Sequence, residues 1–403
     1  EMGLGERLAQ VRRRRGLTQE ELGERSGLSV AVINKLEQGQ RDSVRVATLH
    51  ALARGLDVRT AELFEGAAYM DDTEERGRAT LLPLRRVLEP GPPGSVTSAE
   101  PVPVAALRAM VEDTARLYND SRLNDAVTEL PAVLTAAQAA VAEYAESDRA
   151  AAGRLLAFAY IIAGSVLIQL RHEDLAYGAI RQAAEAAGSV DDHVIRASTA
   201  SYLAWIFLRQ GRFADAEDTA VRMAEEIEPS LARSTPAHIS IWGRLLVRAS
   251  ASAARNNRPE RARDLLTLAR SAAVRVERDR LDYGAYFASF GPTTVATMEV
   301  EMAMTSGDPA RALALARDVP SSTHIPQSTW TRHLLAVAEA QTEVREYNAA
   351  VQTIGQLRDM TPEWLRNQRL AHHIVRDLLD AATVRRARKV GLADLASYMG
   401  VRP

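Results

Sequence analysis

The chain has 403 residues, of which 46% are hydrophobic and 25% are charged, and its formal net charge is -2. This length predicts two or more domains, and the composition is that of a soluble protein with a sizeable core. Because the sequence contains no cysteine, it excludes disulfides, thiolate metal sites and cysteine nucleophiles. The absence of a long uninterrupted apolar run and of an apolar secretion segment favours a cytoplasmic protein without a membrane span.

The positive charge comes almost entirely from arginine, since lysine occurs only at Lys35 and Lys389. A high arginine count in such a chain is no evidence of nucleic-acid binding, and any contact with DNA must come from a local patch. The motifs along the chain therefore carry more information than its bulk charge.

The first two helices are predicted near the N-terminus. Apolar residues spaced three and four apart give the first helix one buried stripe. They are Leu4, Leu8 and Val11. Gly16 ends this helix. Thr18, followed three residues later by Glu21, predicts a capping box at the start of the second helix. Gly27 supplies the next turn, where a left-handed backbone favours glycine.

The third helix is predicted to begin after Ser29 and to end at Gly39, and about three residues join it to the second helix. A fourth helix and a short fifth helix follow. The inward-facing residues of these three helices are Val32, Ile33, Leu36, Val46, Leu49, Leu52, Ala53, Leu56, Leu63 and Phe64. Five short helices with this connection are typical of a helix-turn-helix unit.

Residues 6 to 64 resemble the XRE family, whose members have lambda-repressor-like DNA-binding domains. The matching residues are Leu17, Thr18, Gln19, Leu22, Ser26, Gly27, Leu28, Ser29, Ile33, Leu36, Glu37, Gly39, Leu49, Leu52, Ala53 and Leu63. The chain departs from the family in one loop, where Ser43-Val44-Arg45 replaces the usual Ser-x-Pro. The resemblance implies an all-α domain over residues 2–66 that binds double-stranded DNA.

The third helix is expected to lie in the major groove and to present its N-terminal, outward residues to base edges. These residues are Ser29, Val30, Ala31, Asn34 and Lys35. Asn34 can pair with adenine through two hydrogen bonds, and Lys35 can reach the acceptors of guanine. Val30 and Ala31 can offer only apolar contact, for instance to a thymine methyl group, and Ser29 is also compatible with a purely capping role.

A second set of residues is expected at the DNA backbone. By resemblance, Gln19 contacts a phosphate or a base edge. Phosphate contacts, which position the protein without specifying sequence, are expected from Arg12, Arg13, Arg41 and Arg45. An arginine run at a helix end is equally compatible with a solvated face. Residues 2–66 hold 11 Lys+Arg against 9 Asp+Glu, so modest, salt-sensitive affinity per copy and a homodimer are expected.

Residues 67–104 are predicted to be a linker. It opens with an acidic cluster over residues 71–75, and the proline- and glycine-rich run over residues 90–95 cannot form a helix or a central strand. Between them, leucines over residues 81–88 indicate a short connecting helix that is interrupted at Pro83. We interpret the segment as a hinge between two folded units.

Residues 105–403 are predicted to form an array of helical hairpins. An apolar residue or proline, followed three residues later by a small residue, recurs just after a polar break. The pairs are Leu123/Ala126, Leu175/Gly178, Phe213/Ala216, Pro259/Ala262, Pro309/Ala312 and Tyr347/Ala350. The pattern resembles tetratricopeptide repeats with longer helices or loops, an all-α solenoid, because the small residues stand 38 to 52 positions apart. The segment from Ala381 to Val401 is expected to cap the array.

By the same resemblance, the first helix of each repeat lines a concave inner face. The residues placed there are Tyr160, Arg171, Trp205, Arg209, Arg244, Glu301, Arg332 and Glu339. The same spacing also places Leu167, Ser198, Val247, Arg255, Thr294, Thr305, Leu335 and Glu343 on this face. A groove with separated charges and a tryptophan suits a short peptide, or a zwitterionic or anionic small molecule. The alternative for each position is an ordinary packed or solvated helix residue.

No enzyme chemistry is expected from this sequence. It lacks the His-Glu-x-x-His motif of metalloproteases, and neither lysine follows the glycine that a phosphate-binding loop requires. His372 and His373 are adjacent and point to different faces of a helix, which makes them a poor pair of metal ligands. Neither a cofactor nor a bound metal is expected.

The whole layout resembles bacterial regulators that join an XRE domain to tetratricopeptide repeats, a group that includes the peptide-sensing quorum regulators of Gram-positive bacteria. The resemblance implies a cytoplasmic, homodimeric transcriptional regulator whose repeat domain senses a peptide or small-molecule effector. The alternative is a scaffold regulator whose repeat domain binds a partner protein instead. Stabilisation by a ligand would support sensing, and co-purification of a second chain would support the scaffold.

Overall fold

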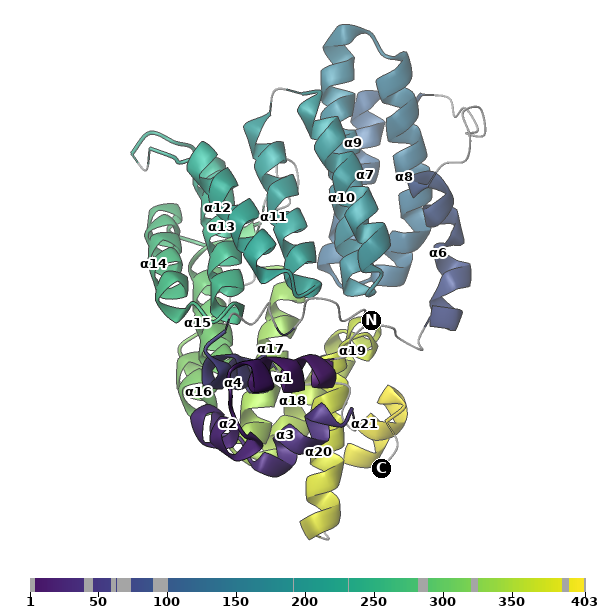
Figure 1. Ribbon diagram of the computed structural model, residues 1–403. Helices are drawn as coiled ribbons and strands as arrows, with labels where there is room; N and C mark the ends of the chain where they lie inside the picture. The colour runs from purple at the N-terminus through teal and green to yellow at the C-terminus, as the bar shows by residue number, and fades with distance from the viewer. Residues whose placement is uncertain are drawn as a thin grey trace.

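A computed structural model of the protein describes residues 4–39, 46–58, 63, 74–89, 101–190, 192–230, 232–281, 289–319, 325–385 and 391–401. Over these residues the protein is all-α, apart from one two-stranded β-hairpin. Figure 1 shows a small group of N-terminal helices and a long stack of helical hairpins. The predicted fold class, a helix-turn-helix domain followed by an α-solenoid, is confirmed.

The N-terminal group contains four helices, α1 (Leu4–Arg14), α2 (Gln19–Ser26), α3 (Val30–Glu37) and α4 (Val46–Leu56). The predicted capping box is present, because the Thr18 hydroxyl accepts from the Glu21 backbone and the Glu21 carboxylate accepts from the Thr18 backbone. Gly27 is left-handed, with φ 70°, as predicted for the turn before α3. One leucine core, which includes fully buried Leu22 and Ile33, joins the helices. Of the predicted fifth helix, only Leu63 lies within the described residues, and it is buried.

The connecting helix α6 (Glu74–Leu88) runs through Pro83 without a break, so the predicted interruption is wrong. A proline inside a helix removes one backbone hydrogen bond and costs about 3 kcal/mol. Pro83 faces solvent, whereas Leu81, Leu84 and Leu88 on the other face are buried in the core of the hairpin stack. Burial of three leucines, at about 1.5–3 kcal/mol each, outweighs the loss. Gln182 also donates to the Leu88 carbonyl at 2.7 Å, which fixes α6 to the stack.

The stack consists of antiparallel helix pairs. The first five pairs are α7 (Val104–Asn119) with α8 (Leu123–Glu143), α9 (Glu146–Gln169) with α10 (Glu173–Gly188), α11 (His193–Arg209) with α12 (Phe213–Glu226), α13 (Pro236–Arg255) with α14 (Pro259–Val276), and α15 (Pro292–Thr305) with α16 (Pro309–Arg317). The last elements are α17 (Gln327–Glu343), α18 (Tyr347–Met360), α19 (Pro362–Arg366), α20 (Arg369–Arg385) and α21 (Leu392–Met399). Five of the six predicted apolar/small pairs begin at the first residue of a second helix. The pair Leu175/Gly178 lies two positions too late, and the buried Ala176 takes the place of the small residue in α10.

Each of these six hairpins turns through a residue with a left-handed backbone two positions before its second helix. The six residues are Ser121, Arg171, Gly211, Asn257, Gly307 and Arg345. The small residue of the motif then packs without gaps, and five of the six, all alanines, are completely buried. Because the turn geometry is the same in every hairpin, Arg171 is a turn residue, and its predicted place in a ligand groove is wrong.

A short β-hairpin, β1 (Arg280–Leu281) with β2 (Ser289–Phe290), interrupts the helical repeat between α14 and α15. Phe290 is fully buried against Gly243 of α13, where an added Cβ would stand 2.2 Å from the ring. Asp279 accepts from the backbone of Thr293 at 3.0 Å and also from its hydroxyl. These contacts fix the start of α15, which is a wall of the site described below.

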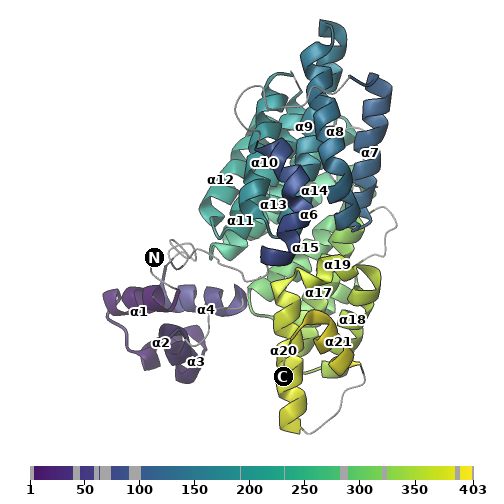
Figure 2. The same cartoon turned by 90° about the vertical axis from the view of Figure 1, so that its right-hand side faces the viewer.

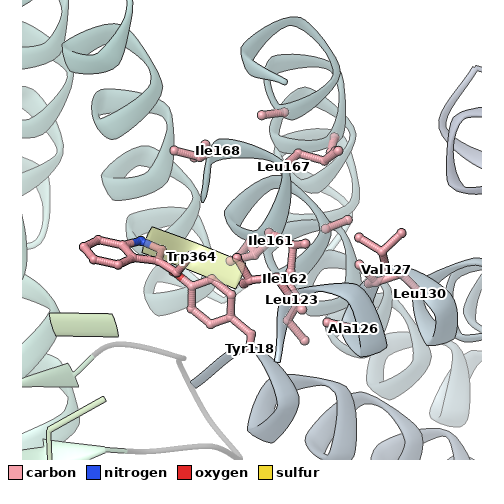
Figure 3. Close-up of a cluster of buried hydrophobic side chains, with 14 of the residues drawn as sticks. Tyr118, Leu123, Ala126, Val127, Leu130, Ile161, Ile162, Leu167, Ile168 and Trp364 are labelled. Atoms are coloured by element: carbon pink, nitrogen blue, oxygen red, sulfur yellow. The ribbon is translucent and has the colours of Figure 1, made fainter. Parts of the chain in front are cut away.

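The core of the first hairpins is continuous with that of the last ones. Figure 3 shows Tyr118, Ile161 and Trp364 in one cluster of buried side chains. The Trp364 indole donates to the Gln169 side chain at 2.9 Å, which ties α19 to α9. Helix α9 contains a segment, Asp148–Gln169, that is apolar and long enough to cross a membrane by composition. Since 89% of its apolar window is buried in the protein, it has the environment of a core helix. The predicted capping segment, Ala381 to Val401, holds the last residues of α20 and the whole of α21, and these two helices pack on each other.

Candidate functional site

Helix α3 presents one polar face to solvent in the full-length chain. The exposed residues are Ser29, Val30, Ala31, Asn34 and Lys35. On the opposite face, Ile33 and Leu36 are buried in the domain core. The Ser29 side chain makes no capping hydrogen bond, so its hydroxyl is not committed to the helix. Figure 2 shows α2 and α3 standing away from the hairpin stack, so the predicted recognition face is open to a DNA duplex.

Arg12 is not at the surface, and the prediction that it contacts phosphate is wrong. It is only 9% exposed, because its guanidinium is enclosed between α1 and α3. It donates to both carboxylate oxygens of Glu37, at 2.7 and 2.9 Å, and to the Leu17 carbonyl at 2.7 Å. All three guanidinium nitrogens are therefore used inside the domain. Its neighbour Arg13 is exposed, while Arg41 and Arg45 lie outside the described residues.

Glu37 joins all three helices of the motif, because it also accepts from the Gln19 amide of α2 at 2.8 Å. Burial alone would raise the pKa of Glu37, but the hydrogen bonds from Arg12 and Gln19 outweigh burial and hold this pKa below its ordinary value. Glu37 is therefore ionised at neutral pH. Gln19 is half-buried, with its amide nitrogen turned toward Glu37, and its contact with DNA stays a prediction.

The hairpin stack contains a cavity of about 70 Å³ that opens to solvent. Four of the eight predicted groove residues meet there, each from the first helix of a different hairpin. They are Trp205 of α11, Arg244 of α13, Glu301 of α15 and Arg332 of α17. Of the further predicted positions, Val247 and Thr294 also line the cavity, whereas Leu167, Ser198, Arg255, Thr305, Leu335 and Glu343 do not. We refer to this cavity as the arginine pocket.

The other predicted groove residues do not line the arginine pocket. Tyr160 is buried between α8 and α9, where its hydroxyl accepts from Gln138 at 2.8 Å. Arg209 lies at the C-terminal end of α11, and burial, followed by the charge of Arg171, lowers its pKa to about 10. Glu339 lies about two turns beyond Arg332 on α17. Their predicted ligand contacts are not supported by this arrangement.

Several lining residues were not predicted. The most informative is Arg248, only 8% exposed, which lies one turn from Arg244 on α13. The guanidinium carbons of Arg248 and Arg332 stand 5.2 and 5.0 Å from the Trp205 ring centroid, a distance typical of cation–π contacts. His333 also lines the pocket, and burial lowers its pKa to about 4. Spacing could have found Arg248, since residues four apart share a helix face.

Helix α15 belongs to the pocket and also contacts the N-terminal domain. Its residues from Thr294 to Glu301 line the arginine pocket, while α4 packs against the same helix. His50 of α4 is buried at this contact and hydrogen-bonds to the backbone of Thr305, at the end of α15. Burial, with further contributions from the charges of Arg255 and Arg54, lowers the pKa of His50 to about 3. The contact therefore favours a neutral imidazole.

Acidification is expected to separate the two domains. A histidine in water titrates near 6.5, whereas docked His50 has a pKa of about 3. Docking of α4 on α15 is therefore strongest above pH 6.5, and it weakens as the pH falls below that value. At pH 5 the docking equilibrium should weaken about 30-fold, or about 2 kcal/mol. Small-angle X-ray scattering at pH 7 and pH 5 measures the separation, with His50→Gln as a neutral control. Equal compactness at both pH values would contradict this reading.

Comparison with known proteins gives matches to the helix-turn-helix class. Residues 3–65 match the sequence profile of a helix-turn-helix domain family. An uncharacterised HTH-type transcriptional regulator of Sinorhizobium fredii, y4dJ, is 45% identical over 60 residues, which cover 15% of this chain and 77% of that protein. The matched residues include the described helices α1 to α4.

Proposed function

We propose, since the chain belongs to the helix-turn-helix transcriptional regulators, that it reads an operator through α3 and responds to an effector held in the arginine pocket. One observation carries the proposal. Four residues from four separate hairpins converge in one pocket, and a wall of that pocket, α15, also supports the DNA-binding domain. A purely structural solenoid needs no such convergence of charge, because buried charges without partners are costly.

On DNA, α3 enters the major groove with Asn34 and Lys35 toward base edges. Ser29, Val30 and Ala31 lie at the leading end of the same exposed face, where they contact the neighbouring bases or the backbone. Arg13 lies on the exposed side of α1 and supplies a phosphate contact. The Arg12–Glu37 pair keeps α1 and α3 in fixed relative orientation, so these contacts act together.

We expect a homodimer acting in the cytoplasm, where the DNA is. One recognition helix covers only a few base pairs, and two copies give the affinity that a mildly basic domain lacks. Size-exclusion chromatography with light scattering should give twice the 44.0 kDa of one chain. A mass of one chain at micromolar concentration, with operator present, would exclude a dimer.

The experiment that tests DNA reading uses the purified full-length chain and sheared genomic DNA at moderate salt. Retained fragments are sequenced, and we expect enrichment of a motif made of two half-sites whose centres are about 10 base pairs, or a multiple of that, apart. Retention of all fragments in proportion to their abundance would show that the chain does not read sequence. The recovered motif then serves as the probe in the binding measurements below.

A further inference from the structure

The arginine pocket carries more positive than negative charge, because three arginines, Arg244, Arg248 and Arg332, line it together with one carboxylate, Glu301. The Arg248 side chain is buried, and its Nε makes no hydrogen bond. Neither Arg248 nor Arg332 forms an ion pair with a carboxylate among the described residues. Glu301, the carboxylate in the lining, is engaged by Arg255, which approaches from outside the pocket. Within the described part of the chain, Arg244 donates to the Ser289 carbonyl at 2.9 Å, and the side chains of Arg248 and Arg332 have no such acceptor.

The unpaired charges oppose one another. Burial lowers the pKa of Arg248 well below its ordinary value, and the neighbouring charges of Arg244 and Arg332 lower it further. Burial is also the main cause of the lowered pKa of Arg332, and the opposite charge of Glu301 counteracts only part of this lowering. A guanidinium stays protonated in proteins, so the pocket stays charged. Burying this charge costs free energy of folding. The two cation–π contacts with Trp205 offset only part of that cost.

Two further buried groups in the lining lack partners. The Thr294 hydroxyl and the His333 Nδ1 are buried, and neither makes a hydrogen bond. Buried polar atoms in native proteins are nearly always paired, so each unpaired one requires an explanation. Together with the Arg248 Nε, they form a set of groups that could hydrogen-bond the oxygens of a bound molecule. The lining also has an apolar part, with Val247, Met298 and Ala336 on three helices, beside the hydroxyl-bearing residues Thr297, Ser328 and Thr329.

We propose that the arginine pocket binds an amphipathic organic carboxylate. Its carboxylate accepts hydrogen bonds from Arg248 and Arg332, and Thr294 completes the polar end. Its apolar body lies against Val247, Met298 and Ala336. Guanidinium and carboxylate match each other in geometry, and their charge-assisted hydrogen bonds are strong where water is excluded. This inference rests on the proposed effector function, and it names the chemical class of the effector.

The test measures ligand binding to the full-length chain without DNA. The probes are benzoate and octanoate as carboxylates, benzamide and octanamide as neutral matches, and inorganic phosphate as an anion without an apolar body. Fragments of this size bind in about the millimolar range. We expect the two carboxylates to raise the melting temperature and change the tryptophan fluorescence at about 10 mM, and the two amides to have no effect.

The decisive variant is Arg248→Met, which keeps an unbranched apolar side chain and removes the buried charge. We expect carboxylate affinity to fall about 100-fold, since a charge-assisted pair is lost. We also expect the ligand-free variant to melt at a higher temperature than the wild type, because an unpaired buried charge has been removed. An arginine with a merely structural role would give the opposite change in melting temperature.

Arg209→Met is the control, because Arg209 is a half-buried arginine that does not line the pocket. Its affinity for benzoate should stay within about threefold of wild type. The proposal is wrong if neither carboxylate binds, if the amides bind equally well, or if Arg248→Met binds as tightly as wild type. Tighter binding of phosphate than of either carboxylate would also overturn it and would indicate a phosphate ester. DNA binding is measured separately, so a failure of carboxylate binding would not contradict the proposed recognition of operator sequences.

Discussion

Replacing Asn34 and Lys35 together with alanine should abolish specific DNA binding and leave the fold intact. Both side chains are exposed on α3, so their removal creates no cavity. Each well-formed contact with a base edge is worth about 1–3 kcal/mol of discrimination. Loss of both should weaken operator binding at least 100-fold, about 2.8 kcal/mol, which fluorescence anisotropy with the recovered operator measures. Nonspecific binding should fall much less, since phosphate contacts supply most of it.

The matched control for this variant is Asp113→Ala with Arg116→Ala. These side chains form an exposed ion pair on α7, far from α3 along the stack. Surface pairs of this kind contribute little to stability, so both double variants should melt with the wild type. If the Asn34/Lys35 variant still protects the same operator, α3 is not the recognition helix.

Replacing Glu37 with alanine should give the largest loss of stability in the DNA-binding domain. The side chains of Arg12 and Glu37 are 11% and 7% exposed, so the variant leaves a nearly buried guanidinium without its carboxylate. Breaking such a pair costs about 3–5 kcal/mol, a large share of the 5–15 kcal/mol that stabilises a typical domain. Hydrogen exchange measured by mass spectrometry should show loss of protection over α1, α2 and α3, with the hairpin stack unchanged.

Two further variants separate the ion pair from a general effect of losing a carboxylate. Glu24→Ala removes an exposed carboxylate of α2 and should change stability by less than about 0.5 kcal/mol. Arg12→Met with Glu37→Leu removes both charges and should recover most of the stability, because no charge is left unpaired. If Glu37→Ala is as stable as Glu24→Ala, the pair is not what holds α1 against α3.

The same pair has a pH signature. The pKa of Glu37 is lower in the folded domain than in the unfolded chain, so the folded state binds fewer protons there. Its contribution to stability is complete above the unfolded value, near 4.5, and is lost as pH falls through the folded pKa. Acid should therefore destabilise the wild-type domain more than the Arg12→Met/Glu37→Leu variant. Parallel stability curves for both proteins between pH 6 and pH 3 would contradict this assignment.

Local features of the fold could be predicted because they depend on residues close together in the chain. The capping box at Thr18, the left-handed Gly27 and the small residue at the start of each second helix all follow from local sterics and hydrogen bonding. The course of α6 through Pro83 could not, because its leucines are stabilised by helices α8 and α10, far along the chain. In α6, burial of the leucines in the tertiary structure outweighs the tendency of proline to end a helix.

Four of the eight residues predicted for the ligand groove line the arginine pocket. Counting back from the small residue placed Trp205, Arg244, Glu301 and Arg332 correctly, because their hairpins keep similar helix lengths around the turn. It misplaced Tyr160 and Arg171, because the count there began at Gly178, two positions after Ala176, which is equivalent to the alanines of the other hairpins. Arg209 and Glu339 were also counted into the groove and do not line the pocket. Nor could the sequence assign the partner of Glu37, since five arginines precede α2 and any of them could in principle reach it. Only the packing of α1 on α3 selects Arg12.

Helix α15 has one face in the arginine pocket and its C-terminal end against α4. A molecule that binds tightly only when α15 holds one position must therefore favour one placement of the DNA-binding domain over another. Equilibrium thermodynamics makes such an influence mutual: operator DNA would alter the affinity for the small molecule by the same factor as the small molecule alters the affinity for DNA. A chain bound to its operator would then bind and release the small molecule at a different concentration from a chain that is free in solution.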